Sequence, residues 1–300
     1  MTPNLTLPDR RLERVSVGGA TYLRRVFPAL LGRNADMWVR FRVSMVMDLL
    51  TMVAQASLFF FVGQALGSGG QSWTSNYAAF LTVGLVFSAF LDASLNTPYQ
   101  SIAGNYWSAR LESVLASPCP VWTVVLADSA WGYVRAAINA VMLGIVGWAF
   151  GARISATPGE LGLALVALVL AIVAVLGFGL MSASTFMLIN AKGFSNPVSW
   201  LIGLLQGLVT GAYFPIDQLP RPLEVLAKAL PQTYAIDAAR RLLLDGPAPA
   251  PLATIGPLSP LGTDFLLLAV MAVAVPCLGG WMFAVGMHKA QRDGGLSRWA

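Results

Sequence analysis

Four ionisable residues stand inside otherwise apolar stretches of this sequence, and they are the first candidates for chemistry. Asp48, Asp92, Asp128 and Arg135 each lie within a run long enough to cross a membrane. Such groups are costly to bury, and they usually face the interior of a helix bundle or water. Asp128 and Arg135 are seven residues apart, which places them two turns apart on one helix face. We consider two roles for this intramembrane charge cluster: a structural one, which we favour, in which Arg135 offsets the aspartates, and a proton or ion pathway.

Apolar residues dominate the composition around this cluster. Of the 300 residues, 56% are hydrophobic and only 11% are charged, and the mean hydropathy is +0.67. An average soluble domain has roughly 25% charged residues, so the sequence predicts an all-α integral membrane protein. Six windows are long enough to be transmembrane helices, at residues 43–62, 77–97, 124–149, 161–189, 198–214 and 264–287.

The distribution of Lys and Arg predicts the orientation of these spans. Most of these residues stand before the first predicted span, after the second and fourth, and in the carboxyl-terminal tail. Lys and Arg are retained in cytoplasmic segments, so both termini are expected in the cytoplasm. The formal net charge of +5 fits this topology and an attraction to anionic lipid headgroups. We expect no nucleic-acid binding.

The amino-terminal segment divides into a tail and a helix. Residues 1–20 are polar and predict a flexible cytoplasmic tail, as do residues 291–300 at the other end. Between residues 21 and 42, Leu23, Phe27 and Leu30 recur at helical spacing, with arginines off that stripe. This pattern predicts an amphipathic helix in the membrane interface, which Pro28 should kink or interrupt. The alternative is a basic flank that only fixes orientation.

A second amphipathic helix is predicted at residues 106–117, in the loop after the second span. An apolar face and a polar face alternate along it at helical spacing, and two prolines stop it. Such a helix could lie on the bilayer surface or insert its apolar face into a groove of a cytoplasmic partner, and we favour docking. The candidate docking residues are Trp107, Arg110, Leu111, Glu112, Val114 and Leu115.

The fifth predicted span has a glycine face. Gly203, Gly207 and Gly211 recur at four-residue spacing, which lets another helix approach closely. The sequence leaves open whether this face packs within the chain or against another subunit.

Residues 221–244 follow as two short apolar segments, each too short to cross a bilayer. We expect two re-entrant helices here, between spans five and six. Thr233 is placed to cap the second of them. Arg240 and Arg241 are expected to reach the outer headgroups by snorkelling.

Several kinds of chemistry have no support in the sequence. It contains no Gly-Lys pair, which a phosphate-binding loop of the G-x-x-x-x-G-K type requires. With His288 as its single histidine, it cannot form a zinc site of the H-E-x-x-H type. We therefore expect no catalytic residues and no metal site in this chain, and an energy source outside it.

Three stretches resemble the membrane permease subunit of type 2 ATP-binding-cassette (ABC) exporters, the ABC-2 family. The stretch LESVLASP at 111–118 resembles the family's coupling helix and its L-E-x-x-L-x-S-P pattern. The stretches GAYFPIDQLP at 211–220 and LPQTYAIDAAR at 230–240 resemble the segment in which paired re-entrant helices follow the fifth span. The likeness covers about residues 20–290 and implies a six-span transmembrane domain at 43–290, in the inner membrane of a bacterial cell.

The resemblance also implies partners. Two copies of a cytoplasmic ABC ATPase would bind ATP and Mg, so this chain would hold no cofactor itself. A second permease copy would complete the pore, as a homodimer or alternatively a heterodimer, surrounded by membrane lipid.

The substrate expected from the resemblance is an amphiphilic small molecule or drug, taken from the cytoplasm or the inner leaflet. Export of a lipid-linked polysaccharide is the alternative, and a proton-coupled secondary transporter using the charge cluster is a weaker one. Candidate residues of the substrate path are Phe59, Phe60, Tyr213, Phe214 and Tyr234.

Overall fold

The computed structural model describes residues 19–43, 73–108, 110–116, 120–149, 156–188, 200–204, 220–244 and 260–292, with isolated residues between 45 and 61 and at 152, 198, 210 and 212. This part of the chain is helical and contains no strand. Its helices are α1 (Gly19–Arg40), α3 (Trp73–Trp107), α4 (Leu111–Ala116), α5 (Val121–Ala149), α6 (Pro158–Leu188), α8 (Arg221–Lys228), α9 (Pro231–Leu243) and α10 (Leu261–Arg292).

Four of these helices are long and apolar enough to cross a membrane, namely α3 from Ala78 onwards, α5, α6 and α10. They correspond to four of the six predicted windows. The other two windows, 43–62 and 198–214, lie largely outside the described residues, although the residues described at 200–204 are helical. Asp48, Phe59, Phe60, Gly207, Gly211, Tyr213 and Phe214 also lie outside the described residues.

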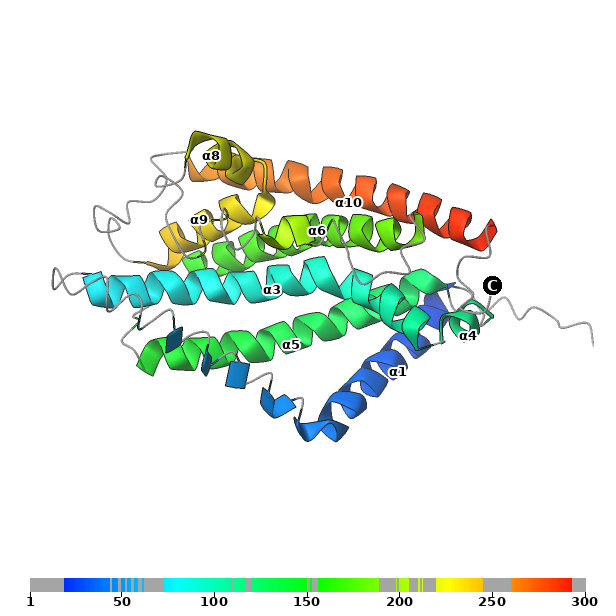
Figure 1. Ribbon diagram of the computed structural model, residues 1–300. Coiled ribbons are helices and arrows are strands. Elements are labelled where there is room, and N and C mark those ends of the chain that lie inside the picture. The colour runs from blue at the N-terminus through cyan, green and yellow to red at the C-terminus, as the bar shows by residue number, and fades with distance from the viewer. Residues whose placement is uncertain are drawn as a thin grey trace, which may run out of the picture.

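The helices pack side by side in the order α10, α6, α3, α5 and α1 (Figure 1). The most apolar window of α3 is 72% buried within this single chain, whereas those of α5 and α10 are only 17% buried. The centre of the bundle is therefore α3 with α6, and α5 and α10 present broad apolar outer faces. Such faces on helices of this length are what lipid contact requires.

The bundle has two ends that carry different short helices (Figure 1). At the end we call the α4 end, α4 joins the end of α3 to the start of α5, and α6 and α10 also finish there. A hydrogen bond from Lys289 Nζ to the Leu188 carbonyl, 3.1 Å long, joins α10 to α6 at this end. At the opposite end, the α8 end, α9 packs against α3, α6 and α10, and α8 contacts α9.

Glycines set the crossing of α6 and α10. A Cβ atom added to Gly279 of α10 would overlap the carbonyl oxygen of Gly177 on α6. A Cβ added to Gly177 would lie 2.6 Å from the backbone nitrogen of Pro276. The two backbones therefore touch at this crossing, which only residues without a side chain allow.

The amino-terminal helix is not interrupted at Pro28, because α1 is one helical element that runs through this residue. The other expectation for this residue, a kink in the helix, stays a prediction. Proline removes one backbone hydrogen bond and crowds the preceding turn; packing against α5 offsets part of that cost. Trp38 of α1 contacts Trp131 of α5 edge to face, with ring centroids 6.1 Å apart.

Candidate functional site

The predicted coupling helix at 106–117 is divided between two elements. α3 ends at Trp107, where the Arg110 N–H donates to the Asn105 carbonyl across 2.9 Å. A hydrogen bond between the backbones of residues five apart is typical of the carboxyl terminus of a helix. α4 then begins at Leu111, and the Ser113 hydroxyl donates to the Arg110 carbonyl across 2.7 Å. Trp107 and Leu111 therefore lie on different helices, not on one continuous apolar face.

Leu111 is not available for docking, because it is only 2% exposed. It packs into a cluster at the α4 end together with Ile102, Tyr106, Val125 and Phe283. This residue anchors α4 to the bundle. The sequence pattern showed an apolar face, and it could not show that the bundle itself covers the start of that face.

Other predicted docking residues remain at the surface. Trp107 is 37% exposed, Arg110 is exposed and Val114 is half-buried. The side chains of Glu112 and Leu115 lie outside what the structure describes. Trp107 packs its ring edge to face on Tyr106, with the centroids 5.4 Å apart, which holds it at the tip of α3.

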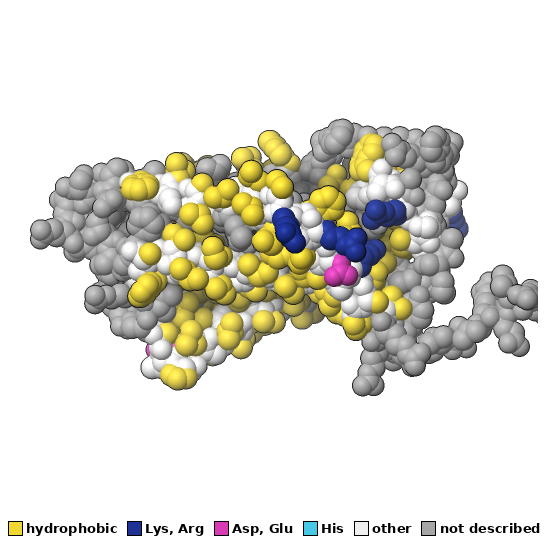
Figure 2. Space-filling model, turned by 90° about the horizontal axis from the view of Figure 1, so that it is seen from below, with side chains coloured by type: hydrophobic (Ala, Val, Ile, Leu, Met, Phe, Trp, Pro, Cys, Tyr) yellow, Lys and Arg dark blue, Asp and Glu magenta, His cyan; other side chains and the backbone are white. Residues whose placement is uncertain are grey.

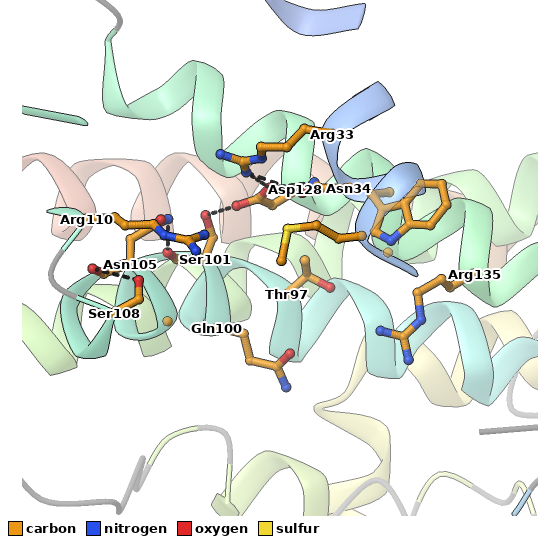
Figure 3. Close-up of a pocket in the computed structure, with 14 residues that line it drawn as sticks. Arg33, Asn34, Thr97, Gln100, Ser101, Asn105, Ser108, Arg110, Asp128 and Arg135 are labelled. Carbon is orange, nitrogen blue, oxygen red and sulfur yellow. Dashed lines mark hydrogen bonds and ion pairs between the residues drawn. The ribbon is translucent and has the colours of Figure 1, made fainter. Parts of the chain in front are cut away.

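A polar cavity of about 440 Å³ opens between α1, α3 and α5 near the α4 end. The face of α3 that borders it carries polar residues at helical spacing, among them Thr97, Ser101 and Asn105. α1 and α5 complete the walls, and Figure 3 shows Arg33 and Asn34 of α1 beside Asp128 of α5 and close to Ser101 of α3. A polar cavity among helices of this apolarity is a candidate functional site.

Asp128 of α5 is held by donors from two other elements. Asn34 Nδ2 on α1 donates to one carboxylate oxygen across 2.7 Å, and a guanidinium nitrogen of Arg33 lies 3.5 Å from the same oxygen. The Ser101 hydroxyl on α3 donates to the other oxygen across 2.6 Å (Figure 3). Asp128 therefore ties α1 and α3 to α5.

The predicted charge cluster is only partly brought together. Asp128 and Arg135 line the same cavity, two turns apart on α5, as their spacing suggested. Asp92 is exposed on α3 and does not line the cavity, and Asp48 lies outside the described residues. The partners that sequence reasoning missed are Arg33, Asn34 and Ser101. The polar face of α3 could have been predicted from the four-residue spacing of Thr97, Ser101 and Asn105.

The short helices at the α8 end lie within the predicted range 221–244, but their contacts differ from expectation. α9 begins at Pro231, so Thr233 is not its cap. The Thr233 hydroxyl instead donates to the Ala227 carbonyl, and the Tyr234 hydroxyl donates to the Lys228 carbonyl, each across 2.7 Å. These two bonds fold α9 back onto α8. Tyr234 is 7% exposed, so in this chain it lies inside the packed bundle.

α8 is amphipathic and more exposed than α9. Lys228 pairs with Glu224 across 2.6 Å, one helical turn away. The hydrogen bond from Lys228 lowers the pKa of the Glu224 carboxyl, and the positive charge of Lys228 adds to that effect. Val225, on the same helix, is 68% exposed.

Arg240 does not reach out to headgroups, which corrects the snorkelling expectation. It is only 6% exposed, and its guanidinium carbon lies 3.3 Å from the centroid of the Phe80 ring on α3. The same guanidinium donates to the Ala212 carbonyl across 2.8 Å and to the Phe80 carbonyl across 3.3 Å. A cation over an aromatic face with two carbonyl acceptors is well satisfied away from water. Gly84 makes room for it, since a Cβ there would lie 2.7 Å from the guanidinium.

Arg241 also turns inward. It pairs with Asp237 one turn earlier on α9 and with Asp264, 3.7 Å away, in the first turn of α10. Asp264 is buried. α9 is thus joined to α3 through Arg240 and to α10 through Arg241.

Comparison with known proteins gives one family and a set of curated relatives. The model of the ABC-2 type transporter family matches residues 25–244. Nodulation protein J of Neorhizobium galegae is 27% identical over 250 residues, covering 81% of this chain and 86% of that protein. Nodulation protein J of Sinorhizobium fredii is 25% identical over 223 residues, covering 73% and 81%. The protein of the same name from Rhizobium leguminosarum bv. trifolii is 26% identical over 227 residues, again covering 73% and 81%.

Proposed function

The chain belongs to the ABC-2 type transporter family, and on that premise we propose that it is the permease subunit of an ATP-driven exporter. Multi-pass membrane proteins of this family are transport components that work with ABC ATPases. The observation that carries the proposal is the family match from α1 through α9, over a bundle whose long helices can cross a membrane. ATP and Mg would be bound by two copies of the partner ATPase, not by this chain.

We place the α4 end at the cytoplasm and the α8 end at the outer side of a bacterial inner membrane. The excess of Lys and Arg in the segments that meet at the α4 end supports this orientation. In this arrangement residues 1–20 and 291–300 are cytoplasmic tails, α1 is the interfacial helix of residues 21–42, and the six-span domain occupies 43–290. Trp107, Arg110 and α4 would face the ATPase, while α8 and α9 would be the re-entrant pair.

The pore is completed by a second permease copy, as a homodimer or alternatively a heterodimer. Gly203 supports an intersubunit role for the glycine face of span five, because a Cβ there would meet no atom of the described chain within 4 Å. The glycine is therefore not used for a close approach within the described part of the chain. The path residues Phe59, Phe60, Tyr213, Phe214 and Tyr234 stay predictions.

The substrate we propose is an amphiphilic small molecule or drug, with a lipid-linked polysaccharide as the alternative. The support is a polar cavity at the α4 end, beside apolar outer faces. The charge cluster gives little support to a proton-coupled transporter, because Asp128 already accepts hydrogen bonds from α1 and α3.

Co-purification tests the proposed function. The chain, tagged in its native host and extracted in mild detergent, should carry a nucleotide-binding ATPase in equal amount, and the complex should hydrolyse ATP. The proposed function would be overturned if the chain purified as an oligomer without an ATPase and transported a solute in vesicles when driven by a proton gradient.

A further inference from the structure

The exposure of α3 changes about halfway along the helix. In the half toward the α8 end, every residue from Ala78 to Leu85 is buried. In the half toward the α4 end, Asp92 and Gln100 are exposed and Asn96 is half-buried. Asp92 lies inside the predicted span 77–97, and an ionisable group at such a position usually faces water or the interior of a helix bundle. The α4 half of α3 therefore presents polar groups that are poorly suited to lipid.

These polar groups belong to one face of the helix. Asp92, Asn96 and Gln100 follow one another at four-residue spacing, which places them along a single face, and we call them the polar stripe of α3. Toward the α8 end the same face carries Leu85 and Ala78, which precede Asp92 by about two and four helical turns. One face of α3 is therefore polar and open toward the α4 end, and apolar and buried toward the α8 end.

The apolar half of this face is covered by α5. Leu85 packs in one cluster with Leu143 and Val146 of α5, and we call these three residues the apolar layer. Ala78 packs in a further cluster with Ala152, just beyond the end of α5, and against Val146. The polar stripe therefore ends, on the side of the α8 end, at a layer of packed apolar side chains.

The other end of the polar stripe joins the cavity between α1, α3 and α5. Gln100 belongs to both, because it is among the residues that line the cavity. Ser108 and Arg110 line the same cavity at the end of α3. From Gln100 the stripe extends about 12 Å along the helix to Asp92. A row of polar side chains thus runs from the α4 end into the span.

The packing of α5 on α3 gives the level of Asp92 relative to α5. Two glycine contacts fix the antiparallel register, since a Cβ added to Gly132 would overlap Thr97 and a Cβ added to Gly147 would overlap Thr82. In this register Asp92 is level with Ala137. Val134 and Val141, on either side of Ala137 along α5, are 44% and 63% exposed.

The outer face of α5 is apolar at the level at which α3 is polar. From Val134 and Val141 it continues with the exposed residues Ile145 and Trp148. Figure 2, which views the α1 and α5 side, shows a largely hydrophobic surface with the charged side chains gathered in one area. Lipid suits the valines of α5, whereas the carboxylate of Asp92 at the same level does not. The two faces therefore have different surroundings.

We propose that the polar stripe of α3 lines a water-filled half-channel, which is open at the α4 end and closed toward the α8 end by the apolar layer. The carboxylate and the two amides of the stripe bind water, and they also suit the hydroxyl or amine groups of an amphiphile. That the polar part of a transported amphiphile enters here rests on the proposed function. The presence of water in the half-channel does not.

Cysteine labelling in sealed membrane vesicles tests the half-channel in the full chain. The parent for these variants carries Cys119→Ala and Cys277→Ala, which remove both native cysteines. Single cysteines are then placed by Asn96→Cys and Gln100→Cys, and a membrane-impermeant methanethiosulfonate reagent is added to one side of the vesicles or to both. The extent of labelling over time is read by mass spectrometry.

Two reference variants show which end of the bundle the reagent reaches. Ser113→Cys marks the α4 end and Arg221→Cys marks the α8 end, and both positions are exposed. The orientation of the vesicles therefore need not be assumed. Val134→Cys and Val141→Cys are the controls for depth, because they bracket the level of Asp92 on the apolar face of α5.

The stripe positions should react from one side of the membrane. We expect Asn96→Cys and Gln100→Cys to be labelled from the side that labels Ser113→Cys. Their rates should be at least about tenfold higher than those of the two valine positions, because the reagent attacks the thiolate, which apolar surroundings disfavour.

The closed end of the half-channel has its own variants. Leu85→Cys should resist the reagent from both sides, since Leu85 is buried in the apolar layer. Adding Leu143→Ala removes part of that layer and should raise the labelling rate of Leu85→Cys from the side of the α4 end. An unchanged rate would show that Leu143 does not close the half-channel.

Two results would overturn the proposal. The first is labelling of Asn96→Cys and Gln100→Cys no faster than that of the valine positions, and the second is labelling only from the side that reaches Arg221→Cys. Thermal unfolding of each variant is compared with that of the cysteine-free parent, and Gln100→Cys, at an exposed position, decides if Asn96→Cys is misfolded. Because no ATPase takes part, a failure here is distinct from a failure of co-purification.

Discussion

Asn34 of α1 and Asp128 of α5 are joined by a 2.7 Å hydrogen bond, although 94 residues separate them in sequence. The same carboxylate accepts from Ser101 of α3, so one side chain holds three helices together. A helix proposed to lie in the membrane interface is thereby fixed to the membrane-spanning bundle. The position of α1 depends on polar contacts at one turn as well as on its apolar stripe.

Replacing Asn34 with Ala should loosen α1 without unfolding the bundle. The change removes the shortest donor that α1 offers to Asp128, and losing a hydrogen bond to a charged group costs about 1–3 kcal/mol. Amide hydrogen exchange should become faster in α1 and stay unchanged in α6 and α10. Asp36→Ala, an exposed change two residues away, is the control. Equal exchange in the two variants would show that this contact does not hold α1.

Truncating Trp107 should weaken ATPase binding. Trp107 is 37% exposed at the α4 end, and aromatic residues of this kind often dominate binding energy. Trp107→Ala should lower the amount of co-purified ATPase by about tenfold or more. Trp148→Ala is the matched control, because Trp148 is 77% exposed on α5 toward the opposite end. A loss of similar size in both variants would contradict the assignment of the docking surface to the α4 end.

Leu111→Ala should act on stability and not primarily on docking. Leu111 is buried among residues of α3, α5, α6 and α10, and truncation of a buried leucine costs about 2–5 kcal/mol. The midpoint of thermal unfolding should fall well below that of Ser113→Ala, an exposed change on the same helix. Folded Leu111→Ala protein should still bind the ATPase. If it unfolds like the parent and loses the ATPase, Leu111 belongs to the docking surface after all.

Arg240→Lys should destabilise the protein even though the charge is kept. The guanidinium stacks on the Phe80 ring and donates hydrogen bonds to two backbone carbonyls. An ammonium group lacks the planar fork that makes these contacts possible together. We expect a loss of about 1–2 kcal/mol in the free energy of unfolding. Arg221→Lys, at an exposed position of α8, should change nothing measurable. Equal unfolding curves for the two lysine variants would show that the buried contacts of Arg240 contribute little.

The sequence could predict the long helices because their signal is local. Apolar runs of sufficient length select a membrane helix whatever lies beside it, and α3, α5, α6 and α10 all fall on predicted windows. The starts of α8 and α9 are likewise marked by prolines, since Pro220 is the N-cap of α8 and Pro231 is the first residue of α9. These helices can be predicted without knowing which other helices pack against them.

The contacts between helices could not be predicted in the same way. In sequence, Arg240 looks the same as an arginine that reaches lipid headgroups. It is buried because α9 packs against α3, where the guanidinium lies over the Phe80 ring. Leu111 is one apolar residue among several on a short amphipathic segment, and the turn at Asn105–Arg110 decides that it faces the bundle. The cavity needs α1, α3 and α5 together, so Asp128 was identified while its donors Asn34 and Ser101 were not.

The crossing of α6 and α10 gives a prediction with a control one residue away. A Cβ on Gly279 would overlap the Gly177 carbonyl oxygen, whereas a Cβ on Gly280 would meet its nearest neighbour, the Trp122 ring, at 3.9 Å. Gly279→Ala must push the two helices apart, and such overpacking costs about 1–3 kcal/mol. Gly280→Ala should be neutral or slightly stabilising, since alanine favours the helix over glycine by about 1 kcal/mol. Unfolding of both variants in the same detergent measures the difference. If Gly279→Ala is as stable as Gly280→Ala, the backbones do not touch at this crossing, and the packing of α10 on α6 must rest on the side chains around it.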